Sequence, residues 1–181
     1  GGVRDPLIIH WPAGLPAGSA GTLRHQFHHV SDLAPTIMEI IGSRKPDVLG
    51  GVQQSPMHGT PLTYTFAEPA TPTRKAVQHF EMLGHRGIVA GGWKAVTIHK
   101  YRTPLTDDVW ELYNLNEDFS ECNDLSETHP DKLGELVELW WEQAEKYKVL
   151  PMQDGMASPN KRPVPTRFKL WPGTVRVPSD N

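Results

Sequence analysis

The stretch from Ala76 to Leu115 constrains the fold most, because it holds four short runs that resemble neighbouring β-strands. These runs are rich in β-branched and aromatic residues, which strands favour, and they cover residues 76–82, 85–90, 93–100 and 109–115. A Gly-Gly pair at Gly91-Gly92 separates the second and third runs, and such a pair predicts a two-residue hairpin turn with positive φ angles. We therefore predict a four-stranded antiparallel sheet that packs, at least in part, on both faces.

Two helices are predicted, one on each side of this sheet in the sequence. The first covers residues 32–41, with Asp32 as its N-cap and Gly42 as its stop signal. The second begins with Thr128 as cap and Pro130 in its first turn. Apolar residues then recur at steps of three and four: Leu133, Leu136, Val137, Trp140, Ala144 and Tyr147. This stripe predicts a long amphipathic helix whose natural partner is the sheet, which makes the fold class α+β.

The remaining segments predict long connections. The chain has 16 glycines and 17 prolines in 181 residues, about 18% against an average near 12%. We divide it into four parts: a strand over Pro6–Pro12 and a helix within residues 1–42, a Pro-rich connection over 43–75, the sheet and helix over 76–150, and an extended Pro-rich arm over 151–181.

Composition excludes several classes of function. The net charge of −3 is too close to zero to indicate nucleic acid or an anionic membrane as a partner. The single cysteine, Cys122, rules out an internal disulfide, and no apolar run reaches the roughly 18 residues of a membrane span. The sequence assigns no compartment. Because it begins with neither a signal peptide nor an initiator Met, we expect the chain to be part of a larger protein.

Few residue patterns indicate chemistry. The sequence has no Gly-rich phosphate loop and no Gly-x-Ser-x-Gly elbow. His25, His28 and His29 could meet a zinc ion if their segment were helical, but it looks extended, so we interpret them as polar loop residues. Asp107-Asp108 could hold a cation, and we interpret the pair as a solvated turn. No metal site is predicted.

A cluster of polar residues surrounds the turn between the first two strands. His79 and Glu81 share one strand face, and Gly84 brings His85 and Arg86 beside them. Four titratable or cationic groups near one end of a sheet could bind an anionic ligand. A network that only satisfies buried charge would look the same, and spacing alone favours this structural interpretation.

Several blocks of the sequence together resemble the C-terminal part of the type I sulfatases, the formylglycine-dependent arylsulfatases of the alkaline phosphatase superfamily. In order they are GGVRDP followed by IIHWPAGL, then HHVSDLAPTIMEIIG, HFEMLGHRGIVAGGWKAV and WELYNLNEDFSECNDL. The resemblance implies that residues 1–42 are the last strand and helix of an α/β main domain. It implies that residues 76–150 are the smaller domain of four antiparallel strands and a long helix.

The same resemblance implies a sulfuric-ester hydrolase as the parent protein. Such enzymes use a formylglycine made within a Cys/Ser-x-Pro-x-Arg motif and a calcium ion held by Asp and Asn residues. Neither version of the motif occurs here, because Cys122, Ser55 and Ser158 all lack the required context. We therefore expect this chain alone to be inactive, without nucleophile or cofactor, and to depend on an N-terminal sulfatase domain as its partner.

The resemblance also suggests where the chain contributes to the parent site. Glu81, His85 and Arg86 match the rim of the substrate cleft, where a sulfate-ester small molecule would enter, and His79 lies beside them. Arg4 follows the part of the family that carries a sulfate-binding Lys, so it would brace that region or form a structural salt bridge. A phosphonate or phosphate monoester hydrolase of the same superfamily and a non-catalytic binding module remain as alternatives.

Overall fold

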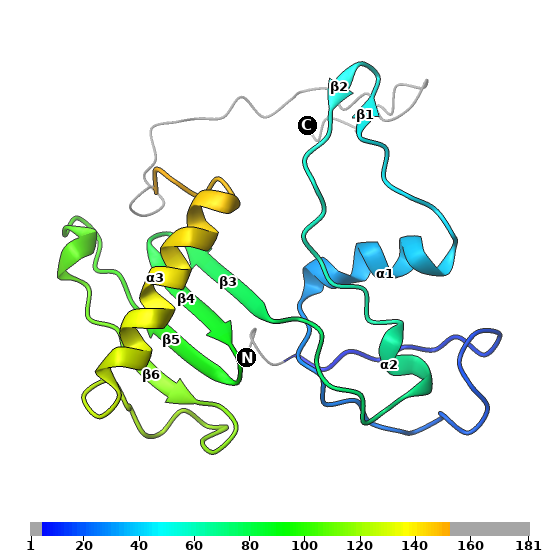
Figure 1. The fold of residues 1–181 in the computed structure, drawn as a ribbon, viewed down its shortest axis with the longest axis horizontal. Coiled ribbons are helices and arrows are strands. Elements are labelled where there is room, and N and C mark those ends of the chain that lie inside the picture. Colours follow the sequence, from blue (N-terminus) through cyan, green and yellow to red (C-terminus); the bar gives the residue numbers. More distant parts are fainter. Residues whose placement is uncertain (1–4, 153–181) are drawn as a thin grey trace, which may run out of the picture. The chain divides into compact units, whose positions relative to one another are not determined.

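The computed structural model describes residues 5–152 (Figure 1). The chain forms two compact units, Gly1–Gln78 and His79–Asn181. Arg4 and most of the predicted arm over 151–181 lie outside the described residues. Within residues 5–152 no helix is both long and apolar enough to cross a membrane.

The first unit is built on a short helix and its surrounding loops. A 3-10 turn, η1 (Val30–Asp32), leads directly into α1 (Leu33–Ile40), and the chain then turns at Gly42, whose φ is 65°. The predicted helix is thus confirmed. Asp32 is the residue before α1, but its side chain makes no capping hydrogen bond to that helix, because its carboxylate is used elsewhere.

The predicted strand over Pro6–Pro12 is wrong for this structure, since these residues form no strand. A strand is stabilised by backbone hydrogen bonds to a neighbour, and no strand of the described chain pairs with this segment. Its aliphatic side chains are exposed, with Leu7 at 54%, Ile8 at 88% and Ile9 at 38%.

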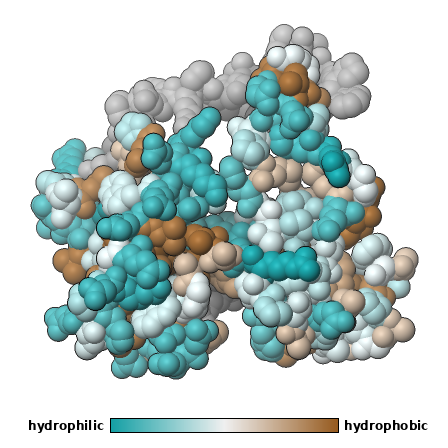
Figure 2. Space-filling model, viewed as in Figure 1, coloured by the Kyte–Doolittle hydropathy of each residue, from teal (hydrophilic) through white to brown (hydrophobic). Residues whose placement is uncertain are grey.

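The connection over 43–75 contains more structure than its lack of periodicity predicted. It forms an antiparallel hairpin from β1 (Val48–Leu49) and β2 (Val52–Gln53), followed by the one-turn helix α2 (Tyr64–Ala67). Val48, Leu49 and Val52 are all more than half exposed, and Figure 2 shows the hydrophobic surface of this hairpin. The two-residue Gly50-Gly51 turn, with both φ angles positive, sets the register.

The second unit contains the predicted sheet, in the order β3-β4-β5-β6. Its strands are β3 (Val77–Met82), β4 (His85–Ala90), β5 (Trp93–Thr97) and β6 (Glu111–Asn114). Ala90 pairs with Trp93 across Gly91-Gly92, so the two-residue hairpin is confirmed. A 3-10 turn, η2 (Leu105–Asp107), lies in the connection between β5 and β6.

The core lies between one face of this sheet and the helix α3 (Pro130–Lys146), which crosses it (Figure 1). The fully buried apolar side chains come from both layers: Ile88, Ala95, Leu112, Leu136, Trp140 and Ala144. Successive strand residues face opposite sides, so Ile88 and Ala95, which pair directly, meet the helix together. The indole N–H of Trp140 also donates to the Phe80 carbonyl at 3.0 Å.

Two details of this unit differ from or extend the expectations. His129, not Thr128, is the residue before α3, and Pro130 occupies the first helical position, because the Thr128 hydroxyl donates to the Leu125 carbonyl instead. On the sheet face away from α3, Val89 is buried whereas Ile98 is 78% exposed. That face is therefore covered only in part.

Candidate functional site

Arg86 lies at the centre of a buried polar network in the second unit. It is placed on the helix-facing side of β4, where it pairs with Thr97 of β5, and its side chain is only 1% exposed. Its Nη2 donates to the Asp108 carboxylate and also to the Leu105 carbonyl, which lies 3.1 Å away. The guanidinium also lies 5.1 to 5.7 Å from three aromatic ring centres, those of Trp110, Trp140 and Trp141. Its charge is thus neutralised inside the fold.

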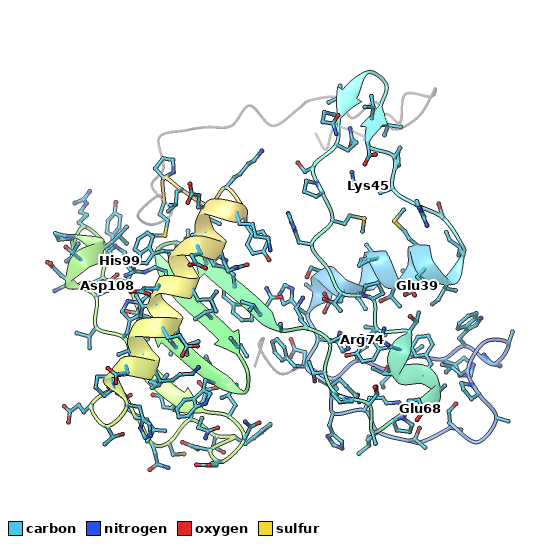
Figure 3. The ribbon with its side chains drawn as sticks, in the orientation of Figure 1. Glu39, Lys45, Glu68, Arg74, His99 and Asp108 are labelled. Carbon is cyan, nitrogen blue, oxygen red and sulfur yellow. The ribbon has the colours of Figure 1, made fainter. Side chains whose placement is uncertain are left out.

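His99 completes this network from the start of the β5–β6 connection. Its Nδ1 lies 2.9 and 3.0 Å from the two carboxylate oxygens of Asp108, and both side chains are at most 3% exposed. Figure 3 shows His99 and Asp108 side by side. The interpretation of Asp107-Asp108 as a solvated turn is therefore wrong for Asp108, because Arg86 and His99 both bind its carboxylate.

The other polar residues of the predicted cluster make separate local contacts. The Glu81 carboxylate accepts the N–H of Gly84 at 2.9 Å and closes the turn between β3 and β4. His85 is exposed, and its Nδ1 accepts the backbone N–H of His99 at 3.0 Å. This contact occupies Nδ1 of His85 with the loop backbone, so Nε2 is the ring nitrogen left to meet a ligand.

His79 belongs to the helix side of the sheet. Its ring stacks on Trp140 with a centroid distance of 4.8 Å and an interplanar angle of 28°. Burial lowers the pKa of His79 below its ordinary value, and the nearby Glu81 charge opposes this effect only in part. The structure therefore brings His79 and Arg86 to the same indole, that of Trp140. His85 lies on the opposite face of the sheet. The four polar residues of the predicted cluster therefore do not converge on a single ligand position.

A second buried cluster, in the first unit, surrounds Asp32 and was not predicted from the sequence. Its carboxylate accepts four hydrogen bonds: the backbone N–H groups of His29 and Thr60 and the Lys75 ammonium at 2.8 Å, and the His28 Nδ1 at 3.2 Å. The sequence marks Asp32 only as a helix cap, and Lys75 carries no local signature. Lys75 is therefore recognisable as the partner of Asp32 only in the folded structure.

The cluster continues from His28 to a tyrosine. The Tyr64 hydroxyl accepts the backbone N–H of Arg74 at 3.0 Å, so its own proton can be donated to His28 Nε2 at 3.1 Å. The opposite ring nitrogen then carries the proton that faces Asp32. These contacts tie η1 to α2 and to the end of the connection over 43–75.

No group of three or more His, Cys, Asp or Glu side chains within residues 5–152 is arranged to hold a metal ion. His28 and His29 point to Asp32 and to Ser31, where a hydrogen bond of 2.9 Å joins His29 Nδ1 to the serine hydroxyl. The described residues therefore do not fit the calcium site that the resemblance implies for a parent enzyme.

Comparisons with known proteins place the chain in relation to one class of enzyme. No family model matches it. It is 30% identical over 163 residues to a Schizosaccharomyces pombe protein described as an uncharacterized sulfatase, which covers 88% of this chain. The chain spans only 28% of the length of that relative.

Solved structures share the fold. A crystal structure of Ps i-CgsB matches 76% of this chain and 27% of its own, with 22% identity and a TM-score of 0.52. A second, of Ps i-CgsB in complex with k-i-k-neocarrahexaose, matches 82% of this chain and 30% of its own, with 22% identity and a TM-score of 0.50.

The sequence match and the sheet-and-helix fold together relate the chain to the sulfatases. The part that it matches is a C-terminal portion of these proteins, as the sequence blocks predicted.

Proposed function

We propose that this chain is the C-terminal portion of a sulfuric-ester hydrolase, where it forms part of the wall of the substrate cleft and supports the catalytic part. The observation that carries the proposal is the 30% identity to a protein described as a sulfatase, of which the chain spans about a quarter. The α+β fold of the second unit is consistent with that match.

The nucleophile and the cofactor of such an enzyme would come from another part of the protein. None of the 181 residues lies in a Cys/Ser-x-Pro-x-Arg motif, and residues 5–152 contain no cluster suited to a metal ion. In this proposal the formylglycine and the calcium ion lie outside the present chain, which contributes side chains around them.

Support for a role in a larger assembly comes from the first unit. Leu7, Ile8 and Ile9 are consecutive and all exposed, although neighbouring residues of an extended chain face opposite sides. A strand that is apolar on both sides is typical of the interior of a parallel sheet covered by helices. Ile37 and Ile41 of the α1 region are also more than half exposed. The N-terminal portion of a sulfatase is the partner that we propose for these surfaces.

For the cleft we assign different roles to the predicted site residues. His85 is exposed and Glu81 half-buried, so both can shape access for the non-sulfate part of a substrate. Arg86 and His79 lie against Trp140 and position the strands beneath. Arg4 stays a candidate brace outside the described residues.

The activity can be tested on the complete open reading frame that contains these 181 residues. Expressed with a formylglycine-generating enzyme, it should release sulfate from 4-methylumbelliferyl sulfate, whereas the 181-residue chain alone should not. Faster hydrolysis of the corresponding phosphate ester would favour the phosphate hydrolases of the superfamily. Hydrolysis of neither ester would favour a binding module.

The cleft assignment needs its own variants in that longer protein. His85→Ala and Glu81→Ala should raise KM or change substrate choice, and each should lower the melting temperature less than Arg86→Met does, because each loses only one partly exposed hydrogen bond. Arg86→Met is the matched control, because loss of its buried ion pair should lower the melting temperature more than it changes KM or substrate choice. Unchanged kinetics with a lowered melting temperature in His85→Ala would refute the role at the cleft.

A further inference from the structure

One side of α3 that is not buried against the sheet carries four exposed residues, which we call the α3 stripe: Gly134, Glu138, Trp141 and Glu145. Their spacing of four, three and four positions makes them neighbours along the helix surface. Within residues 5–152 neither Glu138 nor Glu145 forms a hydrogen bond or an ion pair, whereas Glu135 on the same helix pairs with Lys132 at 2.8 Å. The stripe therefore presents two carboxylates that no described residue neutralises.

Trp141 supplies an apolar surface between these two carboxylates. Its ring stands at 89° to that of Trp140, with 4.9 Å between the centroids, and this contact fixes its orientation. The side chain is nevertheless 38% exposed. A Cβ at Gly134 would meet nothing within 4 Å, so the space one turn before Glu138 is open as well. An indole beside two acids and a gap is a surface that basic and apolar side chains can cover together.

The charge of α3 is matched by the segment that follows it in the chain. Within Pro130–Lys146 five acidic residues stand against two lysines, a net charge of −3. Residues 153–181, which lie outside the described residues, hold five basic and two acidic side chains, a net charge of +3. Their stretch Arg167-Phe168-Lys169-Leu170-Trp171 alternates basic with apolar residues. The arm therefore contains both kinds of group that the α3 stripe can bind.

The arm is also long enough to reach the stripe. α3 ends at Lys146, five residues beyond Trp141, which is about 8 Å along the helix axis. The 14 residues between Met152 and Arg167 can span up to about 45 Å. A tether of this length holds the arm near α3 at an effective concentration of roughly millimolar. Weak ionic contacts then suffice, which favours this segment over a separate partner at lower concentration.

We propose that residues 167–171 of this chain bind across the α3 stripe. Arg167 and Lys169 form charge-assisted hydrogen bonds to Glu138 and Glu145, and the apolar side chains between them cover the exposed part of the indole. This interaction goes beyond the proposed function and does not depend on it, because a binding module without hydrolase activity would contain the same surface.

The test follows proteolysis of the protein expressed from its complete reading frame. Chymotrypsin cleaves after Phe168, and mass spectrometry follows this cut in the protein and in a synthetic peptide of residues 163–178. We expect the cut in the protein to be at least about tenfold slower, because a bound segment must open before it is cleaved. Added salt should accelerate the cut more in the protein than in the peptide, since salt screens exposed ion pairs.

Loss of the two carboxylates should release the arm. Glu138→Gln combined with Glu145→Gln should accelerate the cut about fivefold, as loss of exposed ion pairs does. Glu117→Gln combined with Glu127→Gln is the matched control, because both are exposed acids of the same unit outside α3, and it should leave the rate unchanged. Melting temperatures of both variants check the fold. Equal acceleration in the two variants would overturn the proposal, as would a wild-type cut as fast as that of the peptide.

A charge exchange tests the pairing itself. Glu138→Lys combined with Glu145→Lys should accelerate the cut, and the further changes Arg167→Glu and Lys169→Glu should restore protection once each rate is divided by that of the matching peptide. Failure to restore it would overturn the pairing. Carbodiimide cross-linking of Lys169 to the stripe, in a mixture of unlabelled and isotope-labelled protein, should give links within one molecule. Links between molecules alone would assign the stripe to a second copy and refute the proposal.

Discussion

The Lys75 ammonium lies 2.8 Å from Oδ1 of Asp32, and the two side chains are 5% and 0% exposed although 43 residues separate them. The same carboxylate accepts the backbone N–H groups of His29 and Thr60. One buried carboxylate therefore joins the start of α1 to the middle of the long connection over 43–75 through the Thr60 N–H and to its end through the Lys75 ion pair.

Lys75→Met should destabilise the first unit by about 3–5 kcal/mol, because it leaves a buried carboxylate without its counter-charge. Amide hydrogen exchange at Thr60 and His29 is the local measurement, and both N–H groups should exchange faster. Lys132→Met is the control, since in the Lys132–Glu135 pair the side chains are 29% and 61% exposed, and such a surface pair should contribute less than about 1 kcal/mol. Equal effects of the two substitutions would contradict the structural role of Lys75.

The same pair predicts how acid affects the first unit. Burial alone would raise the pKa of Asp32, but the hydrogen bond from Lys75, those from the His29 and Thr60 backbones, and the Lys75 charge together lower it below the ordinary 3.8. A depressed carboxyl pKa stabilises the fold above pH 3.8, and this stabilisation is lost as the pH falls through the folded value. Asp32→Asn should flatten the dependence of stability on pH below 3.8, measured by acid titration followed by circular dichroism. An unchanged slope in this variant would contradict it.

The sheet could be predicted from sequence because its signals are local. Gly91-Gly92 sets a two-residue turn, and the resulting pairing of Ala90 with Trp93 fixes the register of β4 and β5. The apolar stripe of α3 likewise depends only on residue spacing. Elements whose formation depends on near neighbours are those that a single sequence can specify.

The rest depended on contacts between distant residues. Nothing near Asp108 in the sequence indicates that Arg86, 22 residues away, buries its charge, so a solvated turn was the natural expectation. The strand predicted over Pro6–Pro12 was wrong for the converse reason: its apolar residues suit a strand, but no strand of the described chain pairs with it. In both cases the local pattern was sound and the tertiary partner decided the outcome.

Three glycines give a graded test of the second unit. A Cβ at Gly84, whose φ is 91°, would lie 2.6 Å from the His99 ring, whereas one at Gly91, with φ of 58°, would meet nothing within 4 Å. Gly91→Ala should cost about 1–2 kcal/mol of unfolding free energy from backbone strain alone, and Gly84→Ala should cost more. Gly134→Ala, in the exposed interior of α3 with no neighbour in reach, should stabilise by about 0.5–1 kcal/mol. Urea unfolding of the three variants should give this order, and any other order would contradict the placement of His99 under the turn.

The stability of the second unit should fall as the pH drops below 6.5, because of His79. Burial lowers the pKa of His79, so the unfolded chain binds this proton more readily, and stability is full above the ordinary pKa and declines below it. His79→Phe keeps a ring against Trp140 and should remove this part of the pH dependence. NMR titration of the His79 ring should show a midpoint below 6.5, and a midpoint at or above that value would contradict the prediction. His29, whose pKa is also lowered by burial and by Lys75, should contribute with the same sign in the first unit.

The Arg86–Asp108 pair should show strong energetic coupling, since both side chains are at most 3% exposed. Arg86→Met and Asp108→Asn should each lower the unfolding free energy of the second unit by about 3–5 kcal/mol, because each leaves the other partner buried and unpaired. The double variant should cost clearly less than the sum of the two single losses. In the double variant His99 faces an amide instead of a carboxylate, so this variant should still lose some unfolding free energy. Urea unfolding of the four proteins in a double-mutant cycle measures the coupling, and additive losses would mean that the pair does not hold the β5–β6 loop.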